Sequence, residues 1–507
     1  MDRREFMGGA SGLGLAIAVS DKIVTAAELP SDPTEMSAST LSAAIRQRQV
    51  SCVEVMQAYL ARIHRYNPVY NAIVSMVEDD ELIKQAELPD QALDKDEYWG
   101  WMHGMPHAVK DLANAKGLQT SSGSPIFAGT IAGEDDLHIA RIRAEGAIFI
   151  GKTNTPEFGL GSQSYNPVHG ATGSAYDPNL TSGGSSGGAA CGMATHMLPT
   201  ADGSDMMGSL RNPGAFNNVV GFRPTQGRVP TVPSDEVFYA QLSTDGPMGR
   251  NVEDTIRLLG TMAGYDSRAP LSMRDKIPSF DEFRKVNLDD YRIGWMRDYD
   301  GYLEMERGLL DVCEASLNGL TAHGAVIEDC KPDYDMARLW QTWLTFRHWA
   351  IGGMKPLYDD PDMRKLLKPE VIWEIEGSFD MPASRVAEAA VARTDWYRAL
   401  HAQFEHFDIL AIPTAQVFPF SKDTHWPQRI NRKKMDTYHR WMEVVIGGTL
   451  SGLPVINLPA GFDAKGRPMG IQFIGRMGHD QRVLEFAMAY EQVTDHLGRR
   501  PVLVDQA

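Results

Sequence analysis

Residues 181–192 read TSGGSSGGAACG, a run of small residues between two apolar parts of the chain. Glycine- and serine-rich runs are usually flexible linkers. Here, however, a small-residue helical pattern follows immediately. Three interpretations are therefore open at this point: a hinge, a turn that carries a nucleophile, or part of a catalytic bed.

The composition is that of a soluble globular protein with ample material for a core. The chain has 507 residues, of which 43% are hydrophobic and 23% are charged. Length alone allows roughly three domains of about 150 residues. The net charge of −17 argues against nucleic acid and anionic membrane surfaces as partners. The densest basic run, 432–434, is interpreted as a solvated surface segment.

The first residues have the features of an export signal. Arg3 and Arg4 precede Phe6, an uncharged stretch follows, and small residues lie near 25–28. This pattern is similar to the twin-arginine signal of bacteria. We therefore expect a signal peptide over 1–27 and a periplasmic or secreted protein, the alternative being a cytoplasmic one. No other segment reaches roughly 18 uncharged apolar residues, so no stable membrane insertion is expected.

Periodicity predicts alternating helices and strands in the first 160 residues. Two helices are expected over 41–68, with Ser51 as the N-cap of the second and Pro68 ending it. A short strand is expected over 105–110. A helix from 138, a turn at Gly146 and a strand at 147–150 follow.

Tryptophans are concentrated between 265 and 440, where helical patterns alternate with proline-rich turns. Apolar strands return at 407–415, 453–462 and 468–476, and a final helix is expected over 481–493. We predict one large α/β domain over 28–507, a mixed sheet between helices, with a variable region at about 265–440. The aromatic residues there are interpreted either as core or as an apolar tunnel for an aryl or alkyl substrate.

Cysteines and histidines give no sign of a metal site. The four cysteines form no CxxC pair, and no HExxH motif is present. No metal is therefore predicted. A bridge between Cys313 and Cys330 remains open in an oxidising compartment.

Two motifs compete with the catalytic bed. Residues 146–153, GAIFIGKT, fit a phosphate loop, but the four residues between the glycines favour a buried strand. Residues 183–187, GGSSG, fit a nucleophile elbow with Ser185, which requires a strand immediately before it and a histidine partner. His196, His348 and His401 follow, but none has a distinctive context.

Several further blocks resemble the amidase signature enzymes over about residues 40–495. They are AVKD (108–111), GKTNTPEF (151–158), SGGSSGG (182–188), GSDMMGSLRNP (203–213), VVGFRPTQGRVP (219–230), ILAIPTA (409–415) and GLPVINLPAGFDAKGRPMGIQFIGR (452–476). Their order and number make chance similarity negligible.

The resemblance implies a fold and a site. Lys110 would be the catalytic lysine, Ser185 the middle serine held by a cis peptide, and Ser209 the nucleophile. The oxyanion hole would consist of backbone N–H groups from Met206, Met207, Gly208 and Ser209. Four further residues would support the site: Gly183, Gly184, Asp205 and Arg211, the last two as a structural pair.

The residue types suit amide hydrolysis. A serine hydroxyl needs a base, and a lysine acts as one only when it is neutral, which burial without a carboxylate partner can arrange. Asp111 should point away from Lys110 because neighbours on a strand face opposite sides. The second serine would relay the proton, and the glycines would let the backbone pass closely beneath it.

One departure concerns substrate choice. The family usually has Gly-Gly before the nucleophile, where this chain has Met207 and Gly208. Backbone donors survive such a change, so we expect an altered choice of substrate rather than lost activity. Met206 is bulky as well.

The resulting expectation is an amidase acting on a small, aryl or otherwise hydrophobic amide through an acyl-enzyme, without a metal or organic cofactor. Ester or carbamate hydrolysis is a plausible side activity, and the protein is expected to be a monomer or homodimer. Two alternatives stay open: an amidotransferase-type amidase component that delivers ammonia to a partner, and a catalytically silent binding protein on the same fold.

Overall fold

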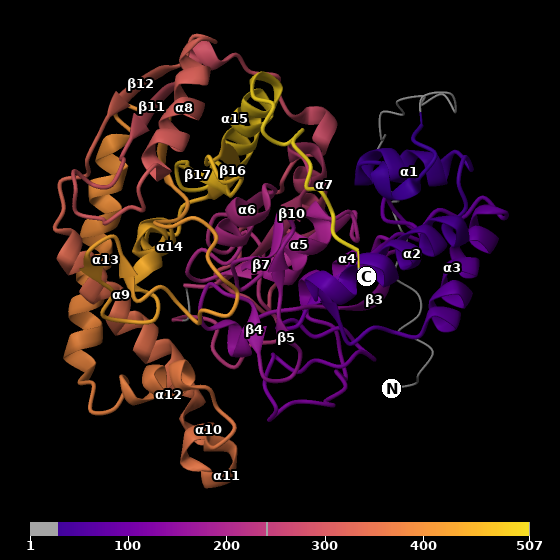
Figure 1. The fold of residues 1–507 in the computed structure, drawn as a ribbon, viewed down its shortest axis with the longest axis horizontal. Helices are drawn as coiled ribbons and strands as arrows, with labels where there is room; N and C mark the ends of the chain where they lie inside the picture. Colours follow the sequence, from indigo (N-terminus) through magenta and orange to yellow (C-terminus); the bar gives the residue numbers. More distant parts are fainter. Residues whose placement is uncertain (1–28, 240–241, 506–507) are drawn as a thin grey trace, which may run out of the picture.

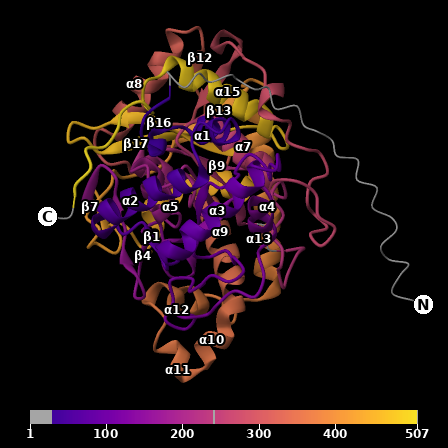
Figure 2. The ribbon, with the colours of Figure 1, turned by 90° about the vertical axis from the view of Figure 1, so that its right-hand side faces the viewer.

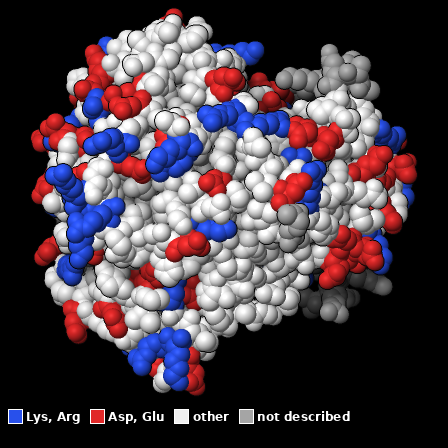
Figure 3. Space-filling view, viewed as in Figure 1, with Lys and Arg blue, Asp and Glu red and all other residues white. Residues whose placement is uncertain are grey.

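The computed structural model describes residues 29–239 and 242–505. The predicted signal peptide over 1–27 lies outside these residues. Among the described residues, no helix is both long enough and apolar enough to cross a membrane. Charges of both signs are interspersed over the face drawn in Figure 3.

A mixed eight-stranded sheet forms the centre of the molecule (Figure 1). Its strands, in spatial order, are β12 (Val326–Asp329), β11 (Arg292–Trp295), β13 (Ile409–Pro413), β17 (Pro468–Ile474), β16 (Val455–Phe462), β9 (Val220–Arg223), β10 (Thr244–Gly249) and β8 (Thr200–Asp205). β11 runs parallel to β12 and β13, and the other neighbours are antiparallel. The expected mixed sheet is therefore confirmed.

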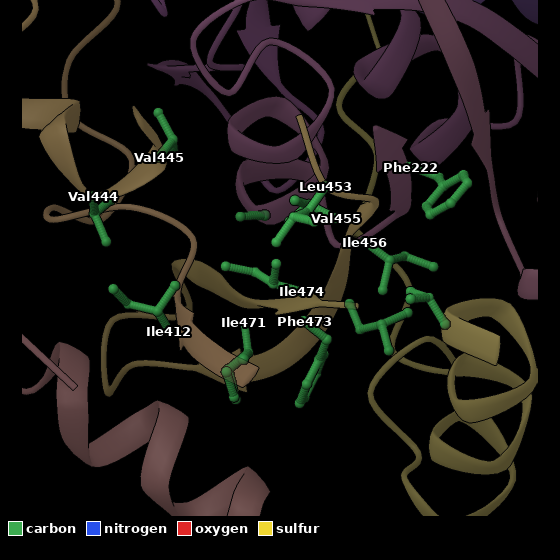
Figure 4. Packing of buried hydrophobic residues seen from close by; sticks show 14 of the residues in the cluster. Phe222, Ile412, Val444, Val445, Leu453, Val455, Ile456, Ile471, Phe473 and Ile474 are labelled. Carbon is green, nitrogen blue, oxygen red and sulfur yellow. The ribbon is translucent and has the colours of Figure 1, made fainter. Parts of the chain in front are cut away.

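Helices cover both faces of this sheet, as alternate residues of β17 show. The ring of Phe473 contacts Phe486 and Tyr490 of α15 (Asp480–Val493). The next side chain back, Gln472, accepts a hydrogen bond from Arg211 of α6 (Arg211–Asn217), on the other face. Apolar side chains of β9, β13, β16 and β17 pack around these strands in Figure 4.

A second, three-stranded sheet carries the N-terminal part of the site. Its order is β1 (Ile73–Val74), β3 (Ile148–Thr153) and β2 (Pro106–Lys110). Three small hairpins complete the strands: β4 (Tyr165–Asn166) with β5 (Gly170–Ala171), β6 (Gly173–Ser174) with β7 (Asp177–Thr181), and β14 (Arg429–Ile430) with β15 (Lys433–Lys434).

The N-terminal helices agree with the periodicity except at one end. α1 (Ala38–Arg46) is followed by α2 (Cys52–Tyr70), and Ser51 and Glu54 form the predicted capping box. Pro68 was expected to end α2. Instead it lies inside the last turn of this helix. A proline there removes one helical hydrogen bond, and the Asn67 side chain accepts the N–H groups of Ala72 and Ile73 just beyond.

The remaining helices before residue 265 are α3 (Asp79–Leu93), α4 (Leu137–Ala144), α5 (Gly187–Ala194) and α7 (Val252–Met262). The turn at Gly146 has a φ of +91°, as a residue without Cβ allows. The strand predicted at 147–150 is β3, which continues to Thr153.

The region 265–440 combines helices with strands of the central sheet. Its helices are α8 (Leu309–Thr321), α9 (Met336–Ile351), α10 (Lys355–Asp359), α11 (Pro361–Arg364), α12 (Pro369–Glu376) and α13 (Ala383–Gln403); α14 (Ile446–Ser451) follows. α10 and α11 project from the body in both Figure 1 and Figure 2. Trp340, Trp343 and Trp396 are fully buried, which supports the core interpretation for these three.

Cys313 and Cys330, left open as a bridge, are both free thiols.

Candidate active site

Lys110 ends β2 and is fully buried. Its Nζ donates to Ser185 Oγ at 2.7 Å, Ser186 Oγ at 2.9 Å and Ser204 Oγ at 3.0 Å. No carboxylate within the described residues forms an ion pair with it. Burial lowers the pKa of Lys110 to about 7, against the opposing charges of Asp202, Asp245 and Asp205.

Asp111 follows Lys110 but serves another purpose, as expected. Its carboxylate accepts the N–H groups of Ser121 and Gly123 and the Ser121 hydroxyl. Because Asp111 faces the opposite side of the chain, Lys110 has no counter-ion there. A buried amine without a counter-ion can be neutral near pH 7.

The Gly/Ser stretch is a buried turn that leads into α5. The peptide bond between Gly184 and Ser185 is cis, and Gly183 has a φ of +73°. A Cβ on Gly184 would lie 2.8 Å from the backbone nitrogen of Gln163. Ser182, Ser185 and every residue of α5 are buried, so this stretch is not a linker.

Ser209 lies between β8 and α6 and is 6% exposed. Its carbonyl accepts the Ser186 N–H at 3.1 Å, which joins the backbone beside Ser185 to that of Ser209. Its hydroxyl forms no hydrogen bond with any described residue. Thus three distant segments bring Lys110, Ser185 and Ser209 to one place.

The loop before Ser209 presents several backbone donors. The Gly208 N–H donates to Asp205 Oδ1 at 2.9 Å, so this donor is engaged. The N–H groups of Met206, Met207 and Ser209 find no acceptor in the described part of the chain. Met207 is buried in the core, whereas the sulfur of Met206 contacts Arg347 of α9.

Asp205 and Arg211 form a fully buried ion pair that fixes this loop. Arg211 Nη2 lies 2.9 Å from Asp205 Oδ1. Burial alone would raise the pKa of Asp205, but the charge and hydrogen bonds of Arg211 hold it well below its ordinary value. Arg211 also donates to Val445 O, Thr449 Oγ1 and Gln472 Oε1, linking α6 to α14 and β17.

The competing motifs do not assemble as sites. Lys152 is buried inside β3, as the strand interpretation requires, and donates to Ala113 O and Thr120 Oγ1. β7 ends at Thr181, shortly before Ser185, but no described histidine forms a hydrogen bond with Ser185. His196 contacts Thr34 O, and His348 contacts Glu374.

Sequence reasoning missed four neighbours of the catalytic side chains. Ser186 and Ser204 share the amine of Lys110 with Ser185. Gly159 has a φ of +70°, and a Cβ there would lie 3.5 Å from Ser185 Oγ. Asp202 accepts the backbone N–H of Lys110 at 3.2 Å. Adjacency to the motif residues was the available signal for Ser186 and Ser204, whereas only the fold reveals the other two.

A cavity of about 500 Å³ reaches Lys110 from the side of β8. Its lining includes Asp202, Ser204, Gln226 and Asp245.

Comparisons with known proteins find relatives along most of the chain. The family model described as Amidase matches residues 54–484. An acylamidase of Rhodococcus erythropolis is 30% identical over 471 residues, covering 92% of this chain and 97% of that protein. The A component of the glutamyl-tRNA(Gln) amidotransferase of Symbiobacterium thermophilum is 29% identical over 500 residues, covering 93% and 99%.

Solved structures of other proteins share this fold. The crystal structure of a bacterial aryl acylamidase of the amidase signature enzymes superposes with a TM-score of 0.85 at 25% identity, covering 92% of this chain and 99% of that one. The 6-aminohexanoate cyclic dimer hydrolase, at 22% identity and a TM-score of 0.79, shares the fold and covers 93% and 99%.

Proposed function

This chain belongs to the amidase signature family, and from that premise we propose that it hydrolyses a carboxylic amide through an acyl-enzyme on Ser209. The observation that supports the proposal most strongly is the buried contact of Lys110 Nζ with Ser185 Oγ at 2.7 Å, without an ion pair to a carboxylate. A neutral amine held against a serine hydroxyl is a base ready to remove a proton.

The proposed reaction has two stages that balance protons and bonds. Ser209 Oγ attacks the amide carbon while its proton passes through Ser185 to Lys110, and the oxyanion accepts free N–H groups of the loop 206–209. The Gly208 N–H can contribute only if its hydrogen bond to Asp205 breaks. The C–N bond then breaks, and the leaving nitrogen takes the proton back. Water then attacks the acyl carbon and gives one proton through Ser185 to Lys110. The bond between the acyl carbon and Ser209 Oγ breaks, Ser209 Oγ takes that proton back, and the acid is released.

We propose a hydrophobic, aryl or alkyl, amide as the substrate. Gly159 lies beside Ser185, and its neighbours Phe158 and Leu160 belong to an apolar cluster. That cluster continues into the region 351–375 through Ile351, Leu367, Val371 and Ile375. These side chains are buried against one another and form an apolar core beside Ser185, so the choice of a hydrophobic amide is supported mainly by the acylamidase relatives.

A panel of amides tests both statements. Small primary amides, anilides, amino acid amides and long-chain acyl amides would be compared for the protein and for Ser209→Ala, Ser185→Ala and Lys110→Ala. We expect all three variants to lose activity and anilides or long-chain amides to be preferred. Full activity of Ser209→Ala with an inactive Ser185→Ala would instead support Ser185 as the nucleophile.

The amidotransferase alternative rests on the glutamyl-tRNA(Gln) amidotransferase relatives. Copurification of a partner protein, with glutaminase activity only in the complex, would support it over the amidase. A fluorophosphonate probe distinguishes the amidase from a catalytically silent binding protein, because the probe labels Ser209 only when its hydroxyl is activated.

Three finer expectations complete the proposal. Activated esters or carbamates should be hydrolysed by the same acyl-enzyme, and a lack of turnover would remove that side activity. Cell fractionation tests export to the periplasm, and sedimentation tests the expected monomer or homodimer.

A further inference from the structure

The catalytic lysine lies where the edges of two sheets face each other. β2 is the edge strand of the three-stranded sheet, and β8 is the edge strand of the eight-stranded sheet. On its other side β8 pairs with β10, so its free edge faces β2. No backbone ladder is formed between β2 and β8, and side chains must therefore hold this junction together.

Asp202 of β8 provides that connection. Its Oδ2 and Oδ1 accept the backbone N–H of Lys110 at 3.2 and 3.3 Å, and Oδ1 lies 3.0 Å from His107 Nε2. Because a carboxylate only accepts, the imidazole proton lies on Nε2. Asp202 is 1% exposed, so these partners replace water completely on this side.

The contacts also keep Asp202 ionised. Burial alone would raise its pKa, but the hydrogen bonds from His107 and from the Lys110 N–H hold the pKa below its ordinary value. A buried N–H at a sheet edge needs an acceptor, and a fixed negative charge here is both that acceptor and a neighbour of the amine.

We propose that Asp202, held by His107, is a positioning residue for the catalytic lysine: it fixes the end of β2 against β8 and supplies a fixed negative charge beside Lys110. The inference rests on the proposed function, in which Lys110 is the base. Through the backbone of Lys110, Asp202 sets where Nζ meets Ser185; through its charge, it sets how readily the amine accepts a proton.

Other charged groups around Lys110 are engaged elsewhere. Asp205 pairs with Arg211, Asp111 accepts from Ser121 and Gly123, and Lys152 donates to Ala113 and Thr120. Two further groups lie on the β10 and α4 side: Asp245, which accepts from Thr231, and His138, which is 3.8 Å from Asp245. Asp245 lines the same cavity as Lys110 but forms no hydrogen bond with β2, and this makes it the matched control.

The test compares Asp202→Asn, Asp202→Ala and Asp245→Asn in the full chain, using the pH profile of anilide hydrolysis. Removing the Asp202 charge should lower the pKa of Lys110 and move the acidic limb of kcat/KM down by about one pH unit. The limiting kcat should fall about tenfold in Asp202→Asn and further in Asp202→Ala, with KM within twofold. Asp245→Asn, which leaves the contacts of Asp202 with β2 in place, should move the limb less and lower the limiting kcat less than Asp202→Asn does.

The proposal is overturned if Asp202→Asn keeps both the acidic limb and the limiting kcat while only its Tm falls. If Asp202→Asn does not fold, His107→Gln loosens the same carboxylate; a several-fold loss of limiting kcat supports the proposal, and an unchanged value overturns it. Fluorophosphonate labelling of Ser209 in the unsubstituted protein separates the two claims, because its absence refutes the proposed function itself.

Discussion

At the scale of single residues, the environment of Lys110 carries the chemistry. A lysine in water is protonated at neutral pH and cannot act as a base. Here the side chain is enclosed by three serine hydroxyls, and Asp111, the adjacent carboxylate, faces other donors. Burial without an ion pair therefore makes the amine available near neutral pH.

This arrangement should reduce the stability of the fold. The pKa of Lys110 is about 7 in the folded chain and about 10.4 in an unfolded one. Between these values the unfolded chain binds the proton more tightly, so protonation favours unfolding and the penalty shrinks as pH rises. Lys110→Met should be inactive yet more resistant to urea at pH 6, with its advantage largely gone by pH 10. An advantage that does not change with pH would contradict a depressed pKa.

The two adjacent serines should differ in importance. Both accept from Lys110, but only Ser185 is proposed to pass the proton to the substrate. Ser185→Ala should lower kcat about 10³-fold, while Ser186→Ala, which removes only a positioning contact, should lower it about tenfold or less. Steady-state kinetics at pH 8 would show this, and equal losses would assign the relay to both hydroxyls.

At the scale of elements, short-range patterns were sufficient for much of the fold. The capping box at Ser51, the turn at Gly146 and strands β13, β16 and β17 follow from local sequence. The predicted end of α2 was wrong. Pro68 removes only one N–H donor from the last turn, and the Asn67 side chain accepts the N–H groups of Ala72 and Ile73 just beyond it. Strands β11 and β12 escaped prediction, since only their parallel partners show that they belong to the sheet.

Helix α5 gives a direct test of close packing. A Cβ on Gly188 would overlap the backbone of Asn154 and Ala72, whereas one on Gly192 would meet only the flexible end of Leu198, at 3.0 Å. Gly188→Ala should therefore cost about 3 kcal/mol or more of the free energy of unfolding, and Gly192→Ala less than about 1 kcal/mol. Urea titrations would measure both, and similar values would mean that α5 is packed less tightly than described.

At the scale of the molecule, the site depends on contacts that no local pattern contains. The family blocks named Lys110, Ser185 and Ser209 from three distant segments, and the structure places Lys110 Nζ 2.7 Å from Ser185 Oγ. The junction of β2 with β8 and the links from Arg211 to α14 and β17 arise only when distant segments fold together. Sequence motifs therefore predicted the candidate residues, but not the side chains that hold their segments in place.

A second long-range cluster should govern acid stability. Glu374 of α12 is fully buried and lies 2.9 Å from Arg347 of α9 and 2.6 Å from the hydroxyl of Tyr438. Burial opposes its ionisation, but Arg347 and its hydrogen bonds lower the pKa of Glu374 to about 2. The unfolded value is about 4.3, so this stabilisation is fully present above that pH and is lost as the pH falls through the folded value.

Glu374→Gln should therefore be about 3–5 kcal/mol less stable than the unsubstituted protein at pH 7, because Arg347 is left buried and unpaired. The difference should narrow between about pH 4 and pH 2, and unfolding followed by circular dichroism would show it. A difference in the free energy of unfolding that stays constant down to pH 2 would mean that Glu374 is not ionised in the folded protein.

The most direct test of the central claim, a neutral lysine acting through Ser185 on Ser209, is the pH profile of anilide hydrolysis for the protein and for Lys110→Ala. The account predicts a rate that rises with pH to a half-maximum near 7 and stays high into the alkaline range, together with loss of activity in the variant. An acidic optimum, or a variant that keeps its activity, would contradict it.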